Sequence, residues 1–143
     1  MLSRILMWIP VFRDLYYAAY HDALTGARNR HWLRKYGRAF QAGFVWFIDI
    51  NGLHEVNQKG GHAAGDKLIK EVSDTLRATP GVLEVIRYGG DEFIAFTEST
   101  KIFITDKTFT AAYEQIGYAG LEYAIRGANV AMLAKKGLNL TNV

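Results

Sequence analysis

The chain has 143 residues, half of them apolar, which predicts a single domain with a proper hydrophobic core. Its net charge of +3 suits an anionic ligand such as a nucleotide, although an excess of this size is also ordinary among proteins. The absence of cysteine excludes disulfides and thiolate metal sites and is compatible with a reducing cytoplasm.

The N-terminal segment, residues 3–20, is expected to form a lead-in helix with Pro10 as the site of any kink. Its apolar start is interrupted by Arg4 and Pro10 and is too short to span a membrane. No small-residue cleavage site follows, so we expect no signal peptide, no membrane contact and a cytoplasmic location. The alternative is contact with a membrane surface through Ile5, Leu6, Trp8 and Ile9.

A second helix is expected over residues 29–42, because apolar side chains recur there near positions i, i+3, i+4 and i+7. They are Trp32, Leu33, Tyr36 and Phe40. Basic residues cluster in and just before the same segment, and we expect them to line its solvated face. They are Arg28, Arg30, Arg34, Lys35 and Arg38.

Residues 44–50 are apolar on both faces, which indicates a central strand that helices cover on both sides. A short helix over residues 53–58 is expected to break at Gly60 and Gly61. A longer helix is then expected over residues 66–76, with its apolar side chains in one stripe.

Two apolar stretches, residues 83–88 and 93–97, flank a pair of glycines and predict a β-hairpin. A further strand is expected over residues 101–110, and a helix over residues 112–136. This order of elements predicts an α/β or α+β sandwich whose antiparallel or mixed sheet is of ferredoxin-like type.

Acidic side chains stand at the ends of two of these strands. Asp49 closes the apolar central strand, and Asp91 and Glu92 come just past the tip of the hairpin. Paired acids at a hairpin tip do little for a fold, but they are well placed to hold a divalent cation over a phosphate. The alternatives are that Asp49 caps a helix and that the acids merely lie on the surface.

Four motifs resemble, in order and approximate spacing, those of the GGDEF domain, the catalytic domain of diguanylate cyclases. They are DALTGARNR from Asp22, the apolar strand into Asp49-Ile50-Asn51 with Asn57 after it, GHAAGD from Gly61, and RYGGDEF from Arg87. The resemblance runs from Asp22 to Phe96 and weakly on to Asn139. It implies a palm-like fold shared with nucleotide cyclases, in which helices flank a mostly antiparallel sheet. It also implies a lead-in or dimerisation helix, residues 1–20, before a GGDEF-type catalytic domain, residues 21–143.

The resemblance implies a metal site for Mg²⁺ or Mn²⁺ against the triphosphate of GTP. Its ligands would be Asp49, the backbone of Ile50, Asp91 and Glu92, with Asp91 and Glu92 as the catalytic pair. Gly89, Gly90, Lys135 and Lys136 would contact the substrate.

Two further positions are similar to the residues with which the family reads guanine. Asp66 would accept from the guanine N1 and N2 hydrogens, and the amide of Asn57 would meet O6 or N3, which favours GTP over ATP. Asp66 also lies where the N-cap of the following helix is expected. Asp22 and Arg30 match family positions as well, and we expect them to form an internal ion pair that anchors the lead-in helix and has a possible regulatory role.

The chain departs from the family in several places. Asn51 replaces the second acid of the D-x-D pair, and Leu53 and His54 replace an aromatic residue and a lysine. Residues 97–112 are too few for the helix and strands of the family, and Leu138 replaces an arginine that grips the triphosphate. The R-x-x-D inhibitory site would fall at residues 80–83, which carry neither charge, so we expect no product inhibition there.

The activity that the resemblance implies is the condensation of two GTP into cyclic di-GMP with release of pyrophosphate, across a homodimer and without a nucleic-acid partner. The short C-terminal half leaves two alternatives open. One is a degenerate nucleotide-binding or interaction module, and the other is a cyclase-like enzyme with a different nucleotide or product.

Overall fold

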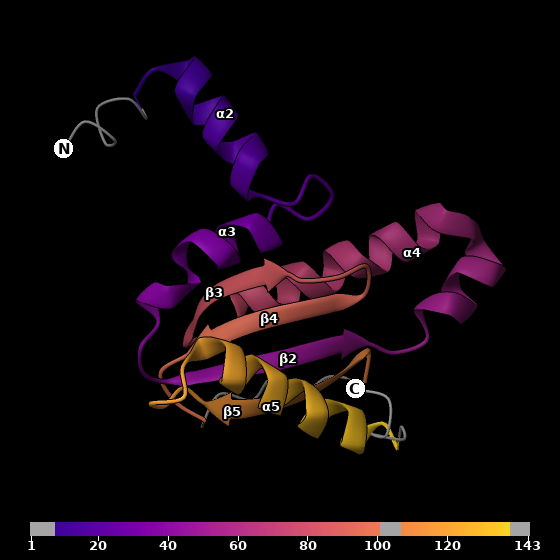
Figure 1. Cartoon of the computed structure of the whole chain (residues 1–143). Helices are drawn as coiled ribbons and strands as arrows, with labels where there is room; N and C mark the ends of the chain where they lie inside the picture. Colours follow the sequence, from indigo (N-terminus) through magenta and orange to yellow (C-terminus); the bar gives the residue numbers. More distant parts are fainter. Residues whose placement is uncertain (1–7, 101–106, 138–143) are drawn as a thin grey trace.

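The computed structural model of the chain describes residues 8–100 and 107–137. In these residues a five-stranded sheet has the order β1-β3-β4-β2-β5. The strands are β1 (Arg28–Asn29), β2 (Phe44–Ile50), β3 (Val82–Arg87), β4 (Glu92–Thr97) and β5 (Phe109–Gln115). The two-residue strand β1 runs parallel to β3, and the other neighbouring pairs are antiparallel. The predicted fold class, a mostly antiparallel sheet flanked by helices, is confirmed (Figure 1).

Helices cover both faces of this sheet (Figure 1). They are α2 (Pro10–Tyr20), α3 (Arg30–Tyr36), α4 (Leu53–Ala78) and α5 (Leu121–Lys135), with a 3₁₀ turn at Gly37–Ala39. Alternate side chains of β2 point to opposite faces, as in any strand. Val45 and Phe47 join one core cluster with side chains of α3 and α5, whereas Trp46, Ile48 and Ile50 join the other with side chains of α4. The central strand is therefore buried on both sides, as its composition predicted.

Helix α4 is bent at Gly61, whose φ of 74° and ψ of 177° are not helical. This confirms the expected break between two helices. The second arm, however, is helical from the residue after Gly61, so it begins before the expected residues 66–76. Asp66 therefore lies inside the helix, and the alternative that it serves as an N-cap is wrong.

Helix α3 is shorter than the expected 29–42. Asn29 caps its start by accepting a hydrogen bond of 3.0 Å from the backbone N–H of Trp32. The helix tightens into the 3₁₀ turn after Tyr36, and Phe40 is already extended because its ring stacks on Phe96 with centroids 4.0 Å apart. Packing against the sheet thus ends the helix earlier than the apolar spacing suggests.

The C-terminal half differs most from the expectation. The helix expected over residues 112–136 begins only at Leu121, because Phe109–Gln115 pairs with β2 as the edge strand β5. Gly120, with a φ of 85°, separates this strand from α5. The strand expected over residues 101–110 falls largely on residues 101–106, which lie outside the described residues.

Helix α2 extends away from the sheet and packs against α3 at its C-terminal end, where Tyr16 and Tyr20 join the core (Figure 1). Pro10 occupies its first turn, where the missing N–H costs nothing. Several large apolar side chains on and just before this helix are exposed, namely Trp8, Ile9, Val11, Phe12, Leu15 and Tyr17. Within the described ranges, no helix has both the length and the apolar character needed to cross a membrane.

Candidate active site

The structure brings the strand-end aspartate and the acidic hairpin together. Asp49 of β2 lies directly opposite Glu92 of β4 in the antiparallel register. One residue further, the backbone N–H of Ile50 donates a hydrogen bond of 2.9 Å to the carbonyl oxygen of Asp91. Figure 1 shows the end of β2, the β3–β4 hairpin tip and the first arm of α4 at the same end of the sheet.

The two glycines of the hairpin have different environments. A Cβ atom at Gly89 would lie 2.4 Å from Oε2 of Glu92, so a side chain here would displace that carboxylate. A Cβ at Gly90 would meet nothing within 4 Å among the described residues. The carbonyl oxygen of Gly90 instead accepts a hydrogen bond of 2.8 Å from Arg87. Gly89 therefore makes room for the acid, whereas Gly90 offers its backbone to the arginine.

The acids repel one another at this tip. Burial raises the pKa of Glu92, and the neighbouring charges of Asp91 and Asp49 raise it further, against the opposing charges of Arg30 and Lys136. Lys136, just past the end of α5, forms an ion pair with Asp49. A cation is thus already bound to one of the three carboxylates.

The two lysines expected to bind substrate are placed differently. Lys135 points to the edge strand, where its Nζ donates a hydrogen bond of 2.7 Å to the carbonyl oxygen of Ala111. Lys136 points to the acids. Of the pair, only Lys136 is brought to the candidate active site.

The donor set at the hairpin fits a hard divalent cation, because carboxylate and carbonyl oxygens are the ligands that Mg²⁺ and Mn²⁺ prefer. The repulsion among three carboxylates is also of the kind that such an ion offsets. No group of three acidic or histidine side chains in the described part of the chain forms a ready-made metal cage. Magnesium sites that handle nucleotides use one or two carboxylates and complete their shell with phosphates and water, so this arrangement still fits.

The bend of α4 holds an amide with an unused acceptor. Oδ1 of Asn57 is buried and has no hydrogen-bond partner among the described residues. It lies against Gly65, where a Cβ would come within 1.9 Å of it. Asp66, the next residue, is exposed. A buried acceptor without a partner beside an exposed carboxylate suits a ligand that carries several N–H donors, as guanine does.

The prediction that Asp22 and Arg30 form an ion pair is wrong. Asp22 instead binds Arg87, whose guanidinium lies 3.2 Å from both carboxylate oxygens, and it also accepts from the N–H and hydroxyl of Thr25. Burial alone would raise the pKa of Asp22, but the hydrogen bonds from Thr25 and the charge of Arg87 outweigh it and lower that pKa. Arg30 lies over the ring of Tyr88, 4.4 Å from its centroid.

Arg87 is a structural residue that the sequence reasoning missed. It bridges the loop of the first motif, through Asp22, to the hairpin tip, through Gly90. The available signal was its place at the start of the RYGGDEF motif. The structure adds that Asp22 is half-buried, and a carboxylate in such a position needs a cation.

Comparisons with known proteins show which family the chain belongs to. The family model described as "Diguanylate cyclase, GGDEF domain" matches residues 19–137. The chain is 37% identical over 92 residues to the probable diguanylate cyclase DgcE of Escherichia coli (strain K12), across 58% of this chain and 8% of DgcE. It is 36% identical over 96 residues to MucR of Pseudomonas aeruginosa, a bifunctional diguanylate cyclase/cyclic di-GMP phosphodiesterase, across 61% of this chain and 14% of MucR.

Among solved structures, a microbial GGDEF domain described with cyclic di-GMP has a TM-score of 0.69 and 24% identity, over 83% of this chain and 94% of that one. A likeness at this identity shows the fold alone. The chain spans less than a sixth of the length of DgcE or MucR. Because the family model covers most of its length, the chain belongs to the GGDEF domain family of diguanylate cyclases.

Proposed function

We propose that the chain is a diguanylate cyclase, a nucleotidyltransferase that condenses two GTP into cyclic di-GMP. The observation that carries this proposal is the convergence of acids, with Asp49 opposite Glu92 and Ile50 hydrogen-bonded to Asp91. The names of the curated relatives support the same reaction. Because GTP is the substrate, we place the activity in the cytoplasm.

In each half-reaction the 3′-hydroxyl oxygen of one GTP forms a bond to the α-phosphorus of the other, and the bond from that phosphorus to the β-phosphate oxygen breaks. Two such steps give cyclic di-GMP and two pyrophosphates. Glu92 is the proposed acceptor of the hydroxyl proton, because burial and the charges of Asp91 and Asp49 raise the pKa of its carboxyl group. Mg²⁺ or Mn²⁺ held by Asp49, the backbone of Ile50, Asp91 and Glu92 would neutralise the phosphates and the leaving pyrophosphate. Lys136 lies beside the same acids and is the side chain placed to bind a phosphate.

The bend of α4 is the proposed guanine site. Asn57 offers an acceptor without a partner, and Asp66 offers an exposed carboxylate for the N1 and N2 hydrogens. Adenine lacks this pair of donors, so the site would favour GTP. Asp66→Asn should lower this preference, which competition between GTP and ATP measures.

A second copy of the chain is part of the proposal, because each active site holds one GTP and the reaction joins two. The exposed apolar side chains of α2 support residues 1–20 as the dimerisation helix and residues 21–143 as the catalytic domain. Sedimentation with and without GTP tests this assignment.

A degenerate, inactive nucleotide-binding module is the second candidate. It is favoured by the Lys136–Asp49 ion pair, which occupies a proposed metal ligand, and by the eleven-residue connection between β4 and β5. Incubation with GTP and Mg²⁺, followed by chromatography, separates the two. Cyclic di-GMP made by the wild type but not by Asp91→Ala supports the cyclase. Bound GTP without turnover in both proteins supports the inactive module, and a different product identifies an altered cyclase.

A further inference from the structure

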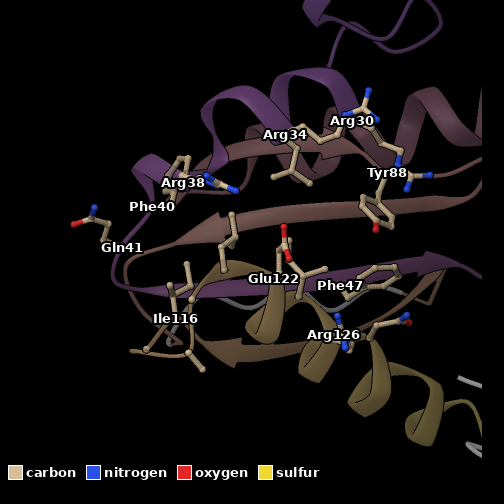
Figure 2. A pocket seen from close by; sticks show the side chains of 17 residues that line it. Arg30, Arg34, Arg38, Phe40, Gln41, Phe47, Tyr88, Ile116, Glu122 and Arg126 are labelled. Atoms are coloured by element: carbon tan, nitrogen blue, oxygen red, sulfur yellow. The ribbon is translucent and has the colours of Figure 1, made fainter.

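A second cleft, of about 900 Å³, opens between α3 and α5 on the sheet face opposite α4 (Figure 2). Asp49, Asp91 and Glu92 are not among the described residues that line it. The cleft is therefore distinct from the three acids but borders them, because its lining residue Tyr88 directly precedes Gly89 and the charge of Arg30 acts on Glu92. Its volume lies within the range of sites that bind small organic molecules.

Four arginines surround this cleft. Arg30, Arg34 and Arg38 follow one another at intervals of four residues along α3 and its 3₁₀ turn, and Arg126 comes from α5. Figure 2 shows Arg34 and Arg38 on the α3 side and Arg126 on the α5 side. Like charges four residues apart on a helix repel each other, so this spacing does not stabilise the helix.

Three of the four guanidinium groups have no anion to balance them. Among residues 8–100 and 107–137, Arg34, Arg38 and Arg126 form no ion pair or hydrogen bond, although Glu122 also lines the cleft. Four arginines against one glutamate give the lining a formal charge of +3, which equals the net charge of the whole chain. The basic excess of the protein is thus accounted for at this one cleft.

The use of arginine rather than lysine in the lining indicates which chemical class of ligand the cleft would bind. The chain has eight lysines and nine arginines, yet the described lining contains four arginines and no lysine. A guanidinium group binds phosphate in a bidentate manner and also stacks on planar rings, whereas an ammonium group binds phosphate as a point charge. An arginine lining therefore favours a ligand that carries both a phosphate and a planar ring.

The floor of the cleft offers half-buried aromatic rings. Phe40 is held rigidly by stacking on Phe96, with ring centroids 4.0 Å apart. Tyr88 packs edge-on against Phe47 at 5.5 Å and lies beneath Arg30. Rings that are fixed in this way can pack against a planar base without further loss of rotamer freedom.

We propose that the α3–α5 cleft binds a nucleotide, with its phosphates on Arg34, Arg38 and Arg126 and its base against Phe40 or Tyr88. The site does not depend on cyclase activity. Its occupant would touch Arg30 and Tyr88, which precede the glycine pair of the acidic hairpin.

Calorimetric titration of the full chain with ADP, in EDTA and without divalent metal, tests the proposal. ADP is the probe because the proposed guanine site should reject adenine, so binding reports on the cleft. We expect ADP to bind more tightly than either pyrophosphate or adenosine, and to bind more weakly as salt is raised. The double variant Arg34→Gln/Arg38→Gln should lose at least about tenfold in ADP affinity, which is the loss of a charge-assisted contact. The matched double variant Lys70→Gln/Arg77→Gln, at exposed positions of the second arm of α4, removes the same charge and should bind ADP like the wild type.

Three outcomes of the titration would overturn the proposal. They are no binding of ADP in the millimolar range, equal weakening by both double variants, and pyrophosphate binding as tightly as ADP. The last would mean that the cleft binds phosphate without a base.

Nuclear magnetic resonance of the arginine Nε–Hε groups locates the ligand. ADP should shift the resonances of Arg34, Arg38 and Arg126 and leave the side-chain amide resonance of Asn57 unchanged. A shift of Asn57 alone would place ADP in the bend of α4 and contradict the cleft. Because no turnover is measured, an inactive cyclase would leave these results unaffected.

Discussion

Gly89 lies directly against the carboxylate of Glu92, so that a Cβ atom there would come within 2.4 Å of Oε2. The next glycine, Gly90, has free space where its Cβ would be. A side chain at position 89 would therefore displace the carboxylate of Glu92, which we propose as the proton acceptor, whereas a side chain at position 90 would not.

Gly89→Ala should leave the fold intact, because the atom in the way is the far end of a flexible side chain. The carboxylate of Glu92 must move, and a displacement of about 1 Å at a reacting group costs about a hundredfold in rate. Synthesis of cyclic di-GMP should fall accordingly. Gly90→Ala is the matched control, because its new methyl group would not touch Glu92. The pH titration of the Glu92 carboxyl group can be followed by its ¹³C resonance. It should change in Gly89→Ala and stay as in the wild type in Gly90→Ala. Identical titrations in both variants would contradict the proposed role of Gly89.

Gly65→Ala should weaken GTP binding without unfolding the protein. The new methyl group would occupy the position of Oδ1 of Asn57, 1.9 Å away, and would turn that amide aside. Overpacking of this kind costs about 1–3 kcal/mol of stability. Asn57→Ala should weaken GTP binding by a similar factor, and the double variant should be no worse than either single variant. Lys70→Ala, at an exposed position further along α4, is the control. Additive losses of affinity in the double variant would show that the two residues act separately.

Asp22→Asn should lower the free energy of unfolding by about 1–3 kcal/mol, because it weakens a half-buried ion pair with Arg87 and the bonds from Thr25. The pKa of Asp22 lies below its ordinary value of 3.8 in the folded state. The carboxylate therefore stabilises the fold fully above that value, and this contribution is lost as the pH falls through the lower folded-state pKa. Denaturant unfolding should show the largest gap between wild type and variant near neutral pH and a shrinking gap in acid. A gap independent of pH would mean that the charge of Asp22 does not matter.

The two lysines at the end of α5 should respond differently to removal of their charge. Lys136→Met removes the cation beside Asp49, so we expect the kcat/KM for GTP to fall by about tenfold or more. Lys135→Met removes only a hydrogen bond to the carbonyl of Ala111, and should cost about 1 kcal/mol of stability with little change in kcat/KM. Equal kinetic losses would show that the placement of Lys136 is not what binds the phosphates.

How much of this structure the sequence predicts depends on which interactions decide each element. The strand 44–50, the bend at Gly61 and the acidic hairpin were predicted because local patterns determine them: a two-sided apolar run, a glycine pair and a turn between apolar stretches. Strand β5 was expected partly as helix because its residues carry no clear alternation, and only pairing with β2 makes them a strand.

The residues of the candidate site also fall into those that local sequence motifs predict and those that only the folded structure brings together. The acids and Asn57 were identified by motif, whereas the partner of Asp22 depends on which arginine the hairpin brings near it. Arg34, Arg38 and Arg126 belong to two helices far apart in sequence. The sequence therefore suggested only a solvated basic face, and the cleft that they share is visible only after folding.

The most direct test of the cyclase proposal is chromatography of nucleotides after incubation of the wild type and Asp49→Asn with GTP and Mg²⁺. We expect the wild type to release cyclic di-GMP and pyrophosphate in a ratio of one to two, and Asp49→Asn to retain its fold while losing this product. A wild type that makes no cyclic di-GMP, or an Asp49→Asn variant that makes it at the wild-type rate, would contradict the proposal.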